Sequence, residues 1–524
     1  MASAYPIGGG VPADAKTFLG HPRGLFMLFF AEMWERFSYY GMRAILVFYL
    51  TKHFLFDEQP AYAVYGAYTT LIYITPIIGG YLSDRFLGAR KSVLAGGIFI
   101  TLGHLLIALV EAPKGIQGTA LDGFYLGLAL IIVGTGFLKA NISVLVGKLY
   151  PRDDLRRDGA FSIFYMGINT GAFIGPIIVG ILGETVGWSY GFGAAGIGMA
   201  LGLAVFVLFR RELHGVGEPP VAEQAKEIPI YIGAIVAVLV SWWLVRSQGV
   251  VGTLLVAASI VTIGYILWTA VFKLPREDRD RIFAALFLVA LSPVFWALFE
   301  QTGSSLNVYT DQAVDRTFLG WTIPASVFQS INPFFIIVLA PIFGALWVKL
   351  ARVGREPSAP FKFGIGLILV GAGFFALILG APAEGLTPAI FVALLYIFHS
   401  AGELCFSPVG LSSMTRLSVA QMTGLMMGTW FLATAGGNFL AGLIAQATGG
   451  EGAGTAQVLE VYGRIGWVSM GLGVGVLVLA PFVSRLMHLD TLGAPADHAL
   501  AGQSLAAEPG AAGIDTRGEQ VPRG

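Results

Sequence analysis

Four charged side chains occur within thirteen residues of an otherwise apolar stretch near the N-terminus. The segment "AEMWERFSYYGMR" contains Glu32, Glu35, Arg36 and Arg43, between "GLFMLFF" before it and "AILVFYL" after it. A charge at the centre of a lipid-facing helix costs about 2.5–3.5 kcal/mol. These side chains must therefore face a protein interior or a water-filled cavity, where carboxylates can exchange protons and arginine can bind an anionic group.

Helical spacing predicts that most of these polar residues share one face. Glu32, Arg36, Tyr39, Tyr40 and Arg43 follow steps of three and four residues. Glu32 can pair with Arg36 inside the helix, and the second carboxylate can reach around the same face. A purely structural ion pair between helices is the alternative, although such a pair needs one acid and one base rather than two of each.

Three more charges lie inside apolar segments, namely Lys139 in "GTGFLKANIS", Glu300 in "FWALFEQTGSS" and Glu403 in "HSAGELCFSPVGLS". A buried lysine alone would lose its proton and a buried glutamate would gain one, so each needs a partner. We predict two ion pairs that join opposite halves of the chain, Lys139 with Glu403 and Arg43 with Glu300. Such pairs could gate a cavity, and a structural role is the alternative for each.

Amide and aromatic side chains accompany these charges. Asn169 in "FYMGINTG" and Asn332 in "FQSINPFF" supply hydrogen-bond donors and acceptors. Any one aromatic residue is more typical of a core, but together they would make an apolar pocket with polar groups in its wall. The aromatic candidates are Tyr39, Tyr40, Tyr73, Trp296, Trp430 and Phe431.

The composition identifies an integral membrane protein. Of 524 residues, 56% are hydrophobic and 12% are charged, whereas soluble domains carry about 25% charged residues. The formal net charge of zero argues against a nucleic-acid partner. The single Cys405 excludes an intrachain disulfide, and the seven scattered histidines suggest no metal site. We expect the protein to need no cofactor and to be a monomer.

Fourteen apolar segments are long enough to span a bilayer. With an internal N-terminus, inner loops hold nineteen Lys and Arg residues and outer loops hold five, which predicts a multi-pass protein of the cell membrane with both termini cytoplasmic. The predicted spans are 22–51, 62–83, 92–110, 122–149, 158–183, 190–210, 228–246, 250–272, 282–310, 318–350, 361–380, 387–415, 420–447 and 458–486.

The spans at 228–246 and 250–272 contain no charge before Arg246 and lie between long basic loops. We interpret them as a helical hairpin inserted between two six-helix halves, which predicts an all-α membrane protein with the major facilitator fold. The expected units are an N-terminal tail (1–21), an N-terminal six-helix bundle (22–211), a linker with the hairpin (212–276), a C-terminal six-helix bundle (277–488) and a disordered tail (489–524).

Three motifs resemble those of a known family. "EMWERFSYYG" is similar to the E-x-x-E-R-F-x-Y-Y-G motif of the proton-coupled oligopeptide transporters, the POT or PTR family of the major facilitator superfamily. "GGYLSDRFLGARKS" and "FYMGINTGAF" resemble its signatures on helices two to three and on helix five. The resemblance implies import of di- and tripeptides driven by protons, without a cofactor.

The resemblance also implies residue roles. Arg36 and Lys139 match binders of the peptide carboxylate, while Asn169, Asn332 and Glu403 match binders of the amino terminus and backbone. The predicted side-chain pockets are lined by Tyr39, Tyr40, Tyr73, Trp296 and Trp430. Proton coupling is expected to involve Glu32, Glu35, Arg36 and Glu300. The implied gates are Arg43–Glu300 on the outer side and Lys139–Glu403 on the inner side.

One departure and two alternatives bear on this assignment. Animal members of the family carry a membrane histidine where Gly66 aligns, so a proton relay here would use carboxylates. A carrier of nitrate or another small anion is the nearest alternative, but no histidine occurs between Ile282 and Thr310, and an anion would gain nothing from Glu403. An intramembrane enzyme is the second alternative, and neither an HExxH nor a GxSxG motif is present.

Overall fold

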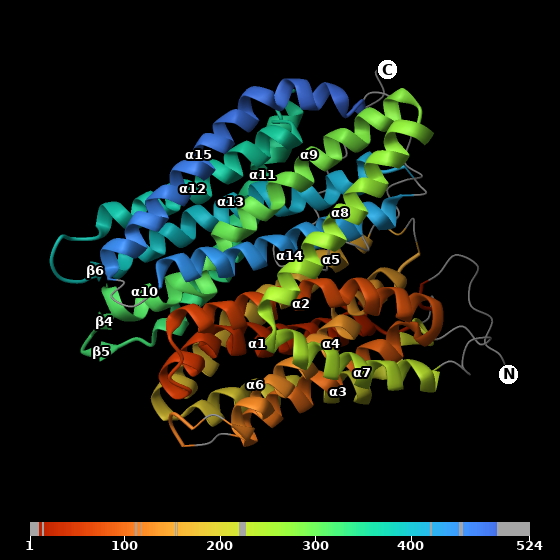
Figure 1. The fold of residues 1–524 in the computed structure, drawn as a ribbon. Coiled ribbons are helices and arrows are strands. Elements are labelled where there is room, and N and C mark those ends of the chain that lie inside the picture. The colour runs from red at the N-terminus through yellow and green to blue at the C-terminus, as the bar shows by residue number, and fades with distance from the viewer. Residues whose placement is uncertain are drawn as a thin grey trace.

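The computed structural model describes residues 10–489 apart from 13–14, 111–112, 117, 152–153, 155, 219–226, 420–421 and 450–453. Residues 1–9 of the expected N-terminal tail and all but the first residue of the expected C-terminal tail lie outside this range. The described chain is almost entirely helical (Figure 1). An all-α architecture is therefore confirmed.

Two groups of helices make up most of the molecule (Figure 1). The N-terminal group comprises α1 (Arg23–Phe48), α2 (Glu58–Leu82), α3 (Gly88–Leu109), α4 (Thr119–Lys148), α5 (Arg156–Ile181) and α6 (Trp188–Leu208). The C-terminal group comprises α9 (Arg276–Phe299), α10 (Ser305–Ala313), α11 (Ile331–Arg352), α12 (Ala359–Gly380), α13 (Ala389–Leu417), α14 (Thr423–Thr448) and α15 (Thr455–Leu486).

Eleven helical stretches of the described residues are long and apolar enough to cross a membrane. One of them covers 52 residues, because α2 continues through a π-helical turn, η2 (Ser83–Leu87), into α3. Helix α1 is not among the eleven, since Glu32, Glu35 and Arg36 fall together in its middle. The chain is thus a multi-pass membrane protein in which one long apolar helix carries an unusual charge cluster.

Glycines allow the helices of the N-terminal group to touch through their backbones. A Cβ atom added to Gly171 of α5 would lie 2.1 Å from the carbonyl oxygen of Met33 in α1. A Cβ atom added to Gly79 of α2 would lie 2.0 Å from the carbonyl oxygen of Gly136 in α4. Membrane helices gain association energy from such close packing, so α1 and α4 are held firmly where their charged residues lie.

The two groups meet along α2 and α14 and along α5, which contacts α11 and a short 3-10 helix, η7 (Ala325–Ser330). A Cβ atom added to Gly66 of α2 would lie 3.0 Å from the Cα atom of Gly442 in α14. The chain thus has glycine on both sides of this contact, which accounts for the small residue at position 66.

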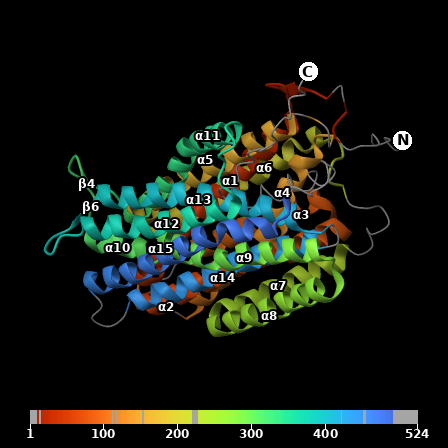
Figure 2. The same cartoon turned by 90° about the horizontal axis from the view of Figure 1, so that it is seen from above.

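Helices α7 (Glu227–Arg246) and α8 (Gln248–Lys273) follow one another with only Ser247 between them. Helix α7 contacts α4 and α2, and α8 contacts α14, α2 and α9. Figure 2 shows both at the side of the molecule, next to α2 and α14. Most of their large apolar side chains are exposed, as expected for lipid-facing helices.

Two predicted spans differ from the structure. The helix expected over 282–310 begins at Arg276 and is interrupted by a 3-10 turn, η6 (Glu300–Gly303), before α10. Gly303 occupies this turn because the Tyr65 hydroxyl lies 1.8 Å from where its Cβ would be. The helix expected over 318–350 begins only at Ala325. The preceding residues form a strand pair, β4 (Thr317–Phe318) with β5 (Trp321–Thr322), in which Gly320 has a φ of 81°.

The remaining strands are equally short. β1 (Thr17–Phe18) pairs antiparallel with β2 (His21–Pro22), and β3 (Val314–Asp315) pairs parallel with β6 (Thr387–Pro388). Below, the proximal end denotes the end of the molecule where α1 begins and α15 ends, and the distal end denotes the opposite end, where β4, β5 and β6 lie (Figure 1).

Candidate functional site

The carboxylates and arginine of α1 form one compact cluster. Arg36 Nε lies 2.8 Å from Glu32 Oε1 and 2.6 Å from Glu35 Oε2, and all three side chains are buried. Lys139 of α4 attracts both carboxylates electrostatically. Two acids and two bases therefore share a buried region of the N-terminal group, which keeps the cost of burying each charge down.

The predicted ion pair between Arg43 and Glu300 is present. Arg43 Nη1 of α1 lies 2.9 Å from Glu300 Oε2, at the break between α9 and α10, and both side chains are buried. The guanidinium also lies over the Tyr40 ring, 5.4 Å from its centroid. This contact joins the two groups of helices. Its role as a gate stays a prediction.

Glu403 belongs to a polar cluster in the C-terminal group. The Asn332 amide nitrogen donates to Glu403 Oε2 at 3.1 Å and to Ser400 Oγ at 3.0 Å. Ser400 donates its own proton to the Tyr396 carbonyl oxygen at 2.7 Å, so it accepts from Asn332. The two N–H groups of Asn332 are thereby used, while its amide oxygen has no hydrogen bond to any residue that the structure describes.

The predicted pair of Lys139 with Glu403 stays a prediction. Lys139 Nζ lies 4.0 Å from the centroid of the Tyr73 ring, and Glu403 accepts a hydrogen bond from Asn332. Asn169 of α5 is buried and donates to the Tyr165 carbonyl oxygen at 3.1 Å.

A small cavity of about 30 Å³ lies between the two groups of helices. Eight residues that the sequence analysis predicted for the site line this cavity. The N-terminal group supplies four of them and the C-terminal group supplies the other four. The predicted site residues in its wall are Tyr40, Arg43, Tyr73, Asn169, Trp296, Glu300, Asn332 and Glu403. The structure therefore brings eight of the predicted residues to one place.

A larger cavity of about 410 Å³ lies toward the proximal end, between α2, α4 and α14. Tyr73 and Lys139 are the predicted residues in its wall, and Tyr73 also lines the small cavity. Sequence reasoning missed Tyr81 and Met427, while Phe431, weighed only as one of several aromatic residues, also lines it. Their spacing resembles that of ordinary apolar helix residues, so no local signal distinguished them.

The other predicted residues do not line either cavity. Glu32, Glu35, Arg36 and Tyr39 are buried behind the cavity walls, with Arg36 over the Tyr39 ring at 5.8 Å. Trp430 is fully buried and packs against Phe363 and Phe406. A substrate contact by Trp430 would need a rearrangement of this aromatic cluster.

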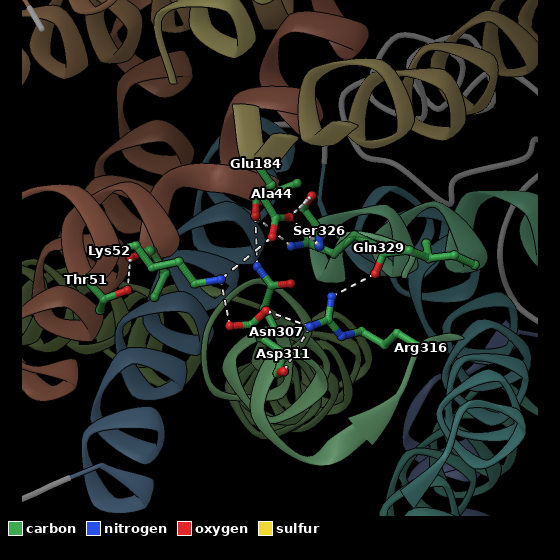
Figure 3. Close-up of polar contacts among 11 residues, drawn as sticks. Ala44, Thr51, Lys52, Glu184, Asn307, Asp311, Arg316, Ser326 and Gln329 are labelled. Atoms are coloured by element: carbon green, nitrogen blue, oxygen red, sulfur yellow. Dashed lines mark hydrogen bonds and ion pairs between the residues drawn. The ribbon is translucent and has the colours of Figure 1, made fainter. Parts of the chain in front are cut away.

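A polar network closes the distal end (Figure 3). Lys52 Nζ, in the π-helical turn η1 (Tyr49–His53) after α1, lies 2.6 Å from Asp311 Oδ2 in α10 and 3.8 Å from Glu184 Oε2. Glu184, in the turn η3 (Leu182–Val186) after α5, accepts the Ser326 hydroxyl proton at 2.5 Å. Arg316 Nη2 holds the other oxygen of Asp311 at 3.0 Å.

Deeper in the same network, the Asn307 amide donates to the Ala44 carbonyl oxygen at 2.8 Å (Figure 3). At the first residue of α2, Glu58 accepts a hydrogen bond from Gln312 at 3.0 Å. Each of these contacts connects the N-terminal group with the C-terminal group. Sequence reasoning counted Lys52 only as an outer charge, because its partners lie more than a hundred residues away.

Comparison with known proteins identifies the family. Residues 90–454 match the family model PTR2, described as the POT family. The chain belongs to the POT family. The resemblance seen in the sequence motifs is thereby confirmed.

Relatives in this family match nearly the whole chain. An uncharacterized transporter, YclF of Bacillus subtilis, is 40% identical over 90% of this chain and 96% of its own length. The peptide transporter YePEPT of Yersinia enterocolitica is 40% identical over 82% of this chain and 88% of its own. Family members are transporters, so the enzyme alternative is rejected.

Solved structures of the family agree with the fold. A peptide transporter POT in complex with alafosfalin has a TM-score of 0.79 and 37% identity, covering 90% of this chain and 97% of its own. A POT family transporter in complex with 5-aminolevulinic acid has a TM-score of 0.78 and 32% identity, covering 90% of this chain and 98% of its own.

Proposed function

We propose that the protein is a proton-coupled symporter that imports di- and tripeptides across the cell membrane by alternating access. The observation that carries the proposal is the charge pattern around the mid-membrane cavities. Basic Arg36 and Lys139 belong to the N-terminal group, and acidic Glu403 with Asn332 belongs to the C-terminal group. A peptide has a carboxylate at one end and an ammonium at the other, which suits this polarity.

The residue roles follow from donor and acceptor chemistry. Arg36 and Lys139 bind the peptide carboxylate, since charge-assisted hydrogen bonds are about twice as strong as neutral ones. Glu403, Asn332 and Asn169 bind the amino terminus and backbone. Aromatic rings tolerate varied side chains, a role we assign to Tyr39, Tyr40, Tyr73, Trp296 and Trp430.

We assign proton coupling to Glu32, Glu35 and Arg36 of α1, together with Glu300 in the ion pair that closes the distal side. A proton on Glu32 or Glu35 removes one of the two charges that hold Arg36, and it frees this guanidinium for the peptide carboxylate. Arg43 and Glu300 then close the distal side, while a Lys139–Glu403 pair controls the proximal side. One proton crossing 100 mV supplies about 2.3 kcal/mol, which corresponds to roughly forty-fold accumulation of a neutral peptide.

The membrane arrangement completes the proposal. We infer fourteen spans, with α9 and α10 forming one interrupted span and α7 with α8 forming a hairpin inserted between two six-helix bundles. The units keep the boundaries 1–21, 22–211, 212–276, 277–488 and 489–524. The excess of Lys and Arg in the loops of the proximal end supports placing that end in the cytoplasm, together with both termini. We expect the transporter to act as a monomer.

Counterflow of labelled dialanine in proteoliposomes tests the proposal. Vesicles preloaded with unlabelled dialanine should accumulate the label, and preloading with nitrate should not drive it. No accumulation of labelled dialanine in dialanine-loaded vesicles, together with counterflow of labelled nitrate in nitrate-loaded vesicles, would favour the anion carrier and overturn the proposal.

The coupling assignment has its own test. Glu32→Gln and Glu35→Gln should each keep dialanine counterflow but lose concentrative uptake under an imposed proton gradient. If either variant still concentrates dialanine, that carboxylate is not a coupling residue.

A further inference from the structure

The same four residues, Thr-Phe-Leu-Gly, occur at 17–20 and at 317–320, and each copy forms a two-residue β-hairpin. In the first, Thr17 pairs with Pro22 and Phe18 with His21. In the second, Thr317 pairs with Thr322 and Phe318 with Trp321. The two hairpins therefore share these four residues and the same pairing register. They lie at opposite ends of the molecule, since the first precedes α1 and the second lies at the distal end.

Leucine is an unusual choice for the turn of these hairpins. Leu19 and Leu319 have φ values of 49° and 50°, and the glycines that follow have values of 80° and 81°. Positive φ at both positions is typical of the type I′ turn, which favours Asn-Gly. A leucine in this conformation is strained. Turn formation therefore does not explain the leucine, and its side chain must have another use.

The hairpin tips expose large apolar side chains. Leu19 is 75% exposed and Leu319 is 92% exposed. Phe18, Phe318 and Trp321 beside them are also exposed. Together the side chains of each hairpin form a small apolar surface at the level where the membrane helices end.

These tips continue the lipid-facing surface of the helices. Beyond the first hairpin, Phe30 of α1 is exposed, and beyond the second, Phe334 and Ile337 of α11 are exposed. Figure 2 shows β4 standing clear of the helical bundle, on the side where α5 and α11 lie. An apolar tip in this position can reach the region between lipid headgroups and acyl chains.

One arginine holds each hairpin in place. Arg156 of α5 donates to the Gly20 carbonyl oxygen at 3.0 Å. Arg316 donates to the Ile323 carbonyl oxygen at 2.7 Å, at the base of the second hairpin. Both turns are therefore presented by the folded protein and are not free loops.

We propose that the two Thr-Phe-Leu-Gly hairpins are anchors that insert their tips into the interfacial region of the bilayer, one in each leaflet. Tryptophan favours this region, and Phe and Leu form the apolar faces of elements that lie in it. A partly inserted leucine gains the hydrophobic energy that offsets its strained turn. Lys16 and Arg23 flank the first hairpin, which suits anionic lipid headgroups. The second hairpin has the same tip and lies at the opposite face.

Fluorescence quenching in lipid nanodiscs tests the proposal. The background is Cys405→Ala, which removes the one native cysteine. Thr17→Cys or Thr317→Cys, both exposed beside a tip, carries the environment-sensitive dye NBD. One quencher is a nitroxide at a shallow position of the lipid acyl chain, and the other is aqueous iodide. Glu384→Cys and Arg355→Cys, in exposed loops, are the control sites.

Each tip is compared with its Leu19→Asn or Leu319→Asn variant. Asparagine suits the turn better than leucine, so the hairpin stays folded while the apolar tip is lost. We expect the nitroxide to quench the leucine-bearing proteins strongly and iodide to quench them weakly. The asparagine variants should show the reverse, with about a tenfold fall in the ratio of inserted to water-exposed tips.

Three results would overturn the proposal. Iodide quenching of the leucine-bearing proteins equal to that at the control sites would place the tips in water. If quenching by the lipid nitroxide is the same in the asparagine variants, the leucine side chains do not contribute to insertion. Quenching that depends on the number of protein copies in each disc would assign the tips to contacts between copies.

Discussion

The distal and proximal ends of this transporter are built differently. At the distal end, Arg43–Glu300, Lys52–Asp311 and Asn307–Ala44 connect the two groups of helices. Toward the proximal end, a cavity of about 410 Å³ is lined by residues of α2, α4 and α14. Opening the distal end therefore requires breaking ion pairs, of which Arg43–Glu300 is buried and Lys52–Asp311 is partly exposed.

The largest effect on transport is expected from a change in the Arg43–Glu300 ion pair, the more buried of the two distal ion pairs. Glu300→Gln leaves the Arg43 guanidinium buried without its countercharge, which shifts the balance away from the closed distal end by about 3–5 kcal/mol. Proton-driven uptake of dialanine in proteoliposomes should fall to the background level. Glu460→Gln, which alters the exposed ion pair with Arg464, is the matched control and should leave uptake unchanged.

The ion pair between Lys52 and Asp311 should stabilise the closed distal end less than the buried pair does, because the Lys52 side chain is 40% exposed. Lys52→Gln is expected to weaken distal closure by about 0.2–1 kcal/mol, and the difference from the native protein should shrink at high salt. The labelling rate of a cysteine placed at the exposed Leu55 measures this. A difference independent of salt would show that Lys52 acts through packing and not through its charge.

A third prediction concerns the site between the ends. Ser400→Ala removes the acceptor that orients the Asn332 amide beside Glu403. We expect the KM for dialanine to rise about threefold to tenfold, as for the loss of one hydrogen bond, with kcat unchanged. Ser413 lies in the same helix, is also buried and donates to the Val409 carbonyl oxygen one turn earlier. Ser413→Ala should leave KM unchanged, and equal effects of both variants would contradict the positioning role.

The smallest effect is expected at a proximal contact that stays within the N-terminal group. Hydrogen bonds from Arg156 lower the pKa of Asp154 from its ordinary 3.8. This carboxylate therefore stabilises the folded state above pH 3.8, and the contribution is lost as the pH falls through the lowered pKa. Asp154→Asn should lower the thermal unfolding temperature slightly at neutral pH and match the native protein at strongly acidic pH. Its dialanine uptake should stay normal.

The sequence predicted the parts of the site that obey local rules. Glu32 and Arg36 are one helical turn apart, and their ion pair follows from that spacing. Charges inside a membrane need partners, and pairing them across opposite halves of the chain predicted the Arg43–Glu300 contact that the structure shows. The membrane class and the all-helical fold followed from hydropathy.

The remaining features depend on tertiary packing. In the break at Glu300–Gly303, Tyr65 leaves no room for a side chain at Gly303, and this contact comes from a distant part of the chain. The hydrogen bonds of Asn332 with Ser400 and Glu403 need α11 and α13 side by side. The distal network depends on turns that end helices, such as η1 and η3, where apolar periodicity gives no information.

Opposite movements of the two ends can be measured directly as distances between spin labels by pulsed electron paramagnetic resonance. In the Cys405→Ala background, a distal pair at positions 55 and 384 and a proximal pair at positions 85 and 355 span the two groups of helices. Compared with the native protein, the Glu300→Gln variant, which lacks the countercharge of Arg43, should have a longer distal distance and a shorter proximal one. Distances that lengthen at both ends together, or a distal distance that changes while the proximal one does not, would contradict alternating access.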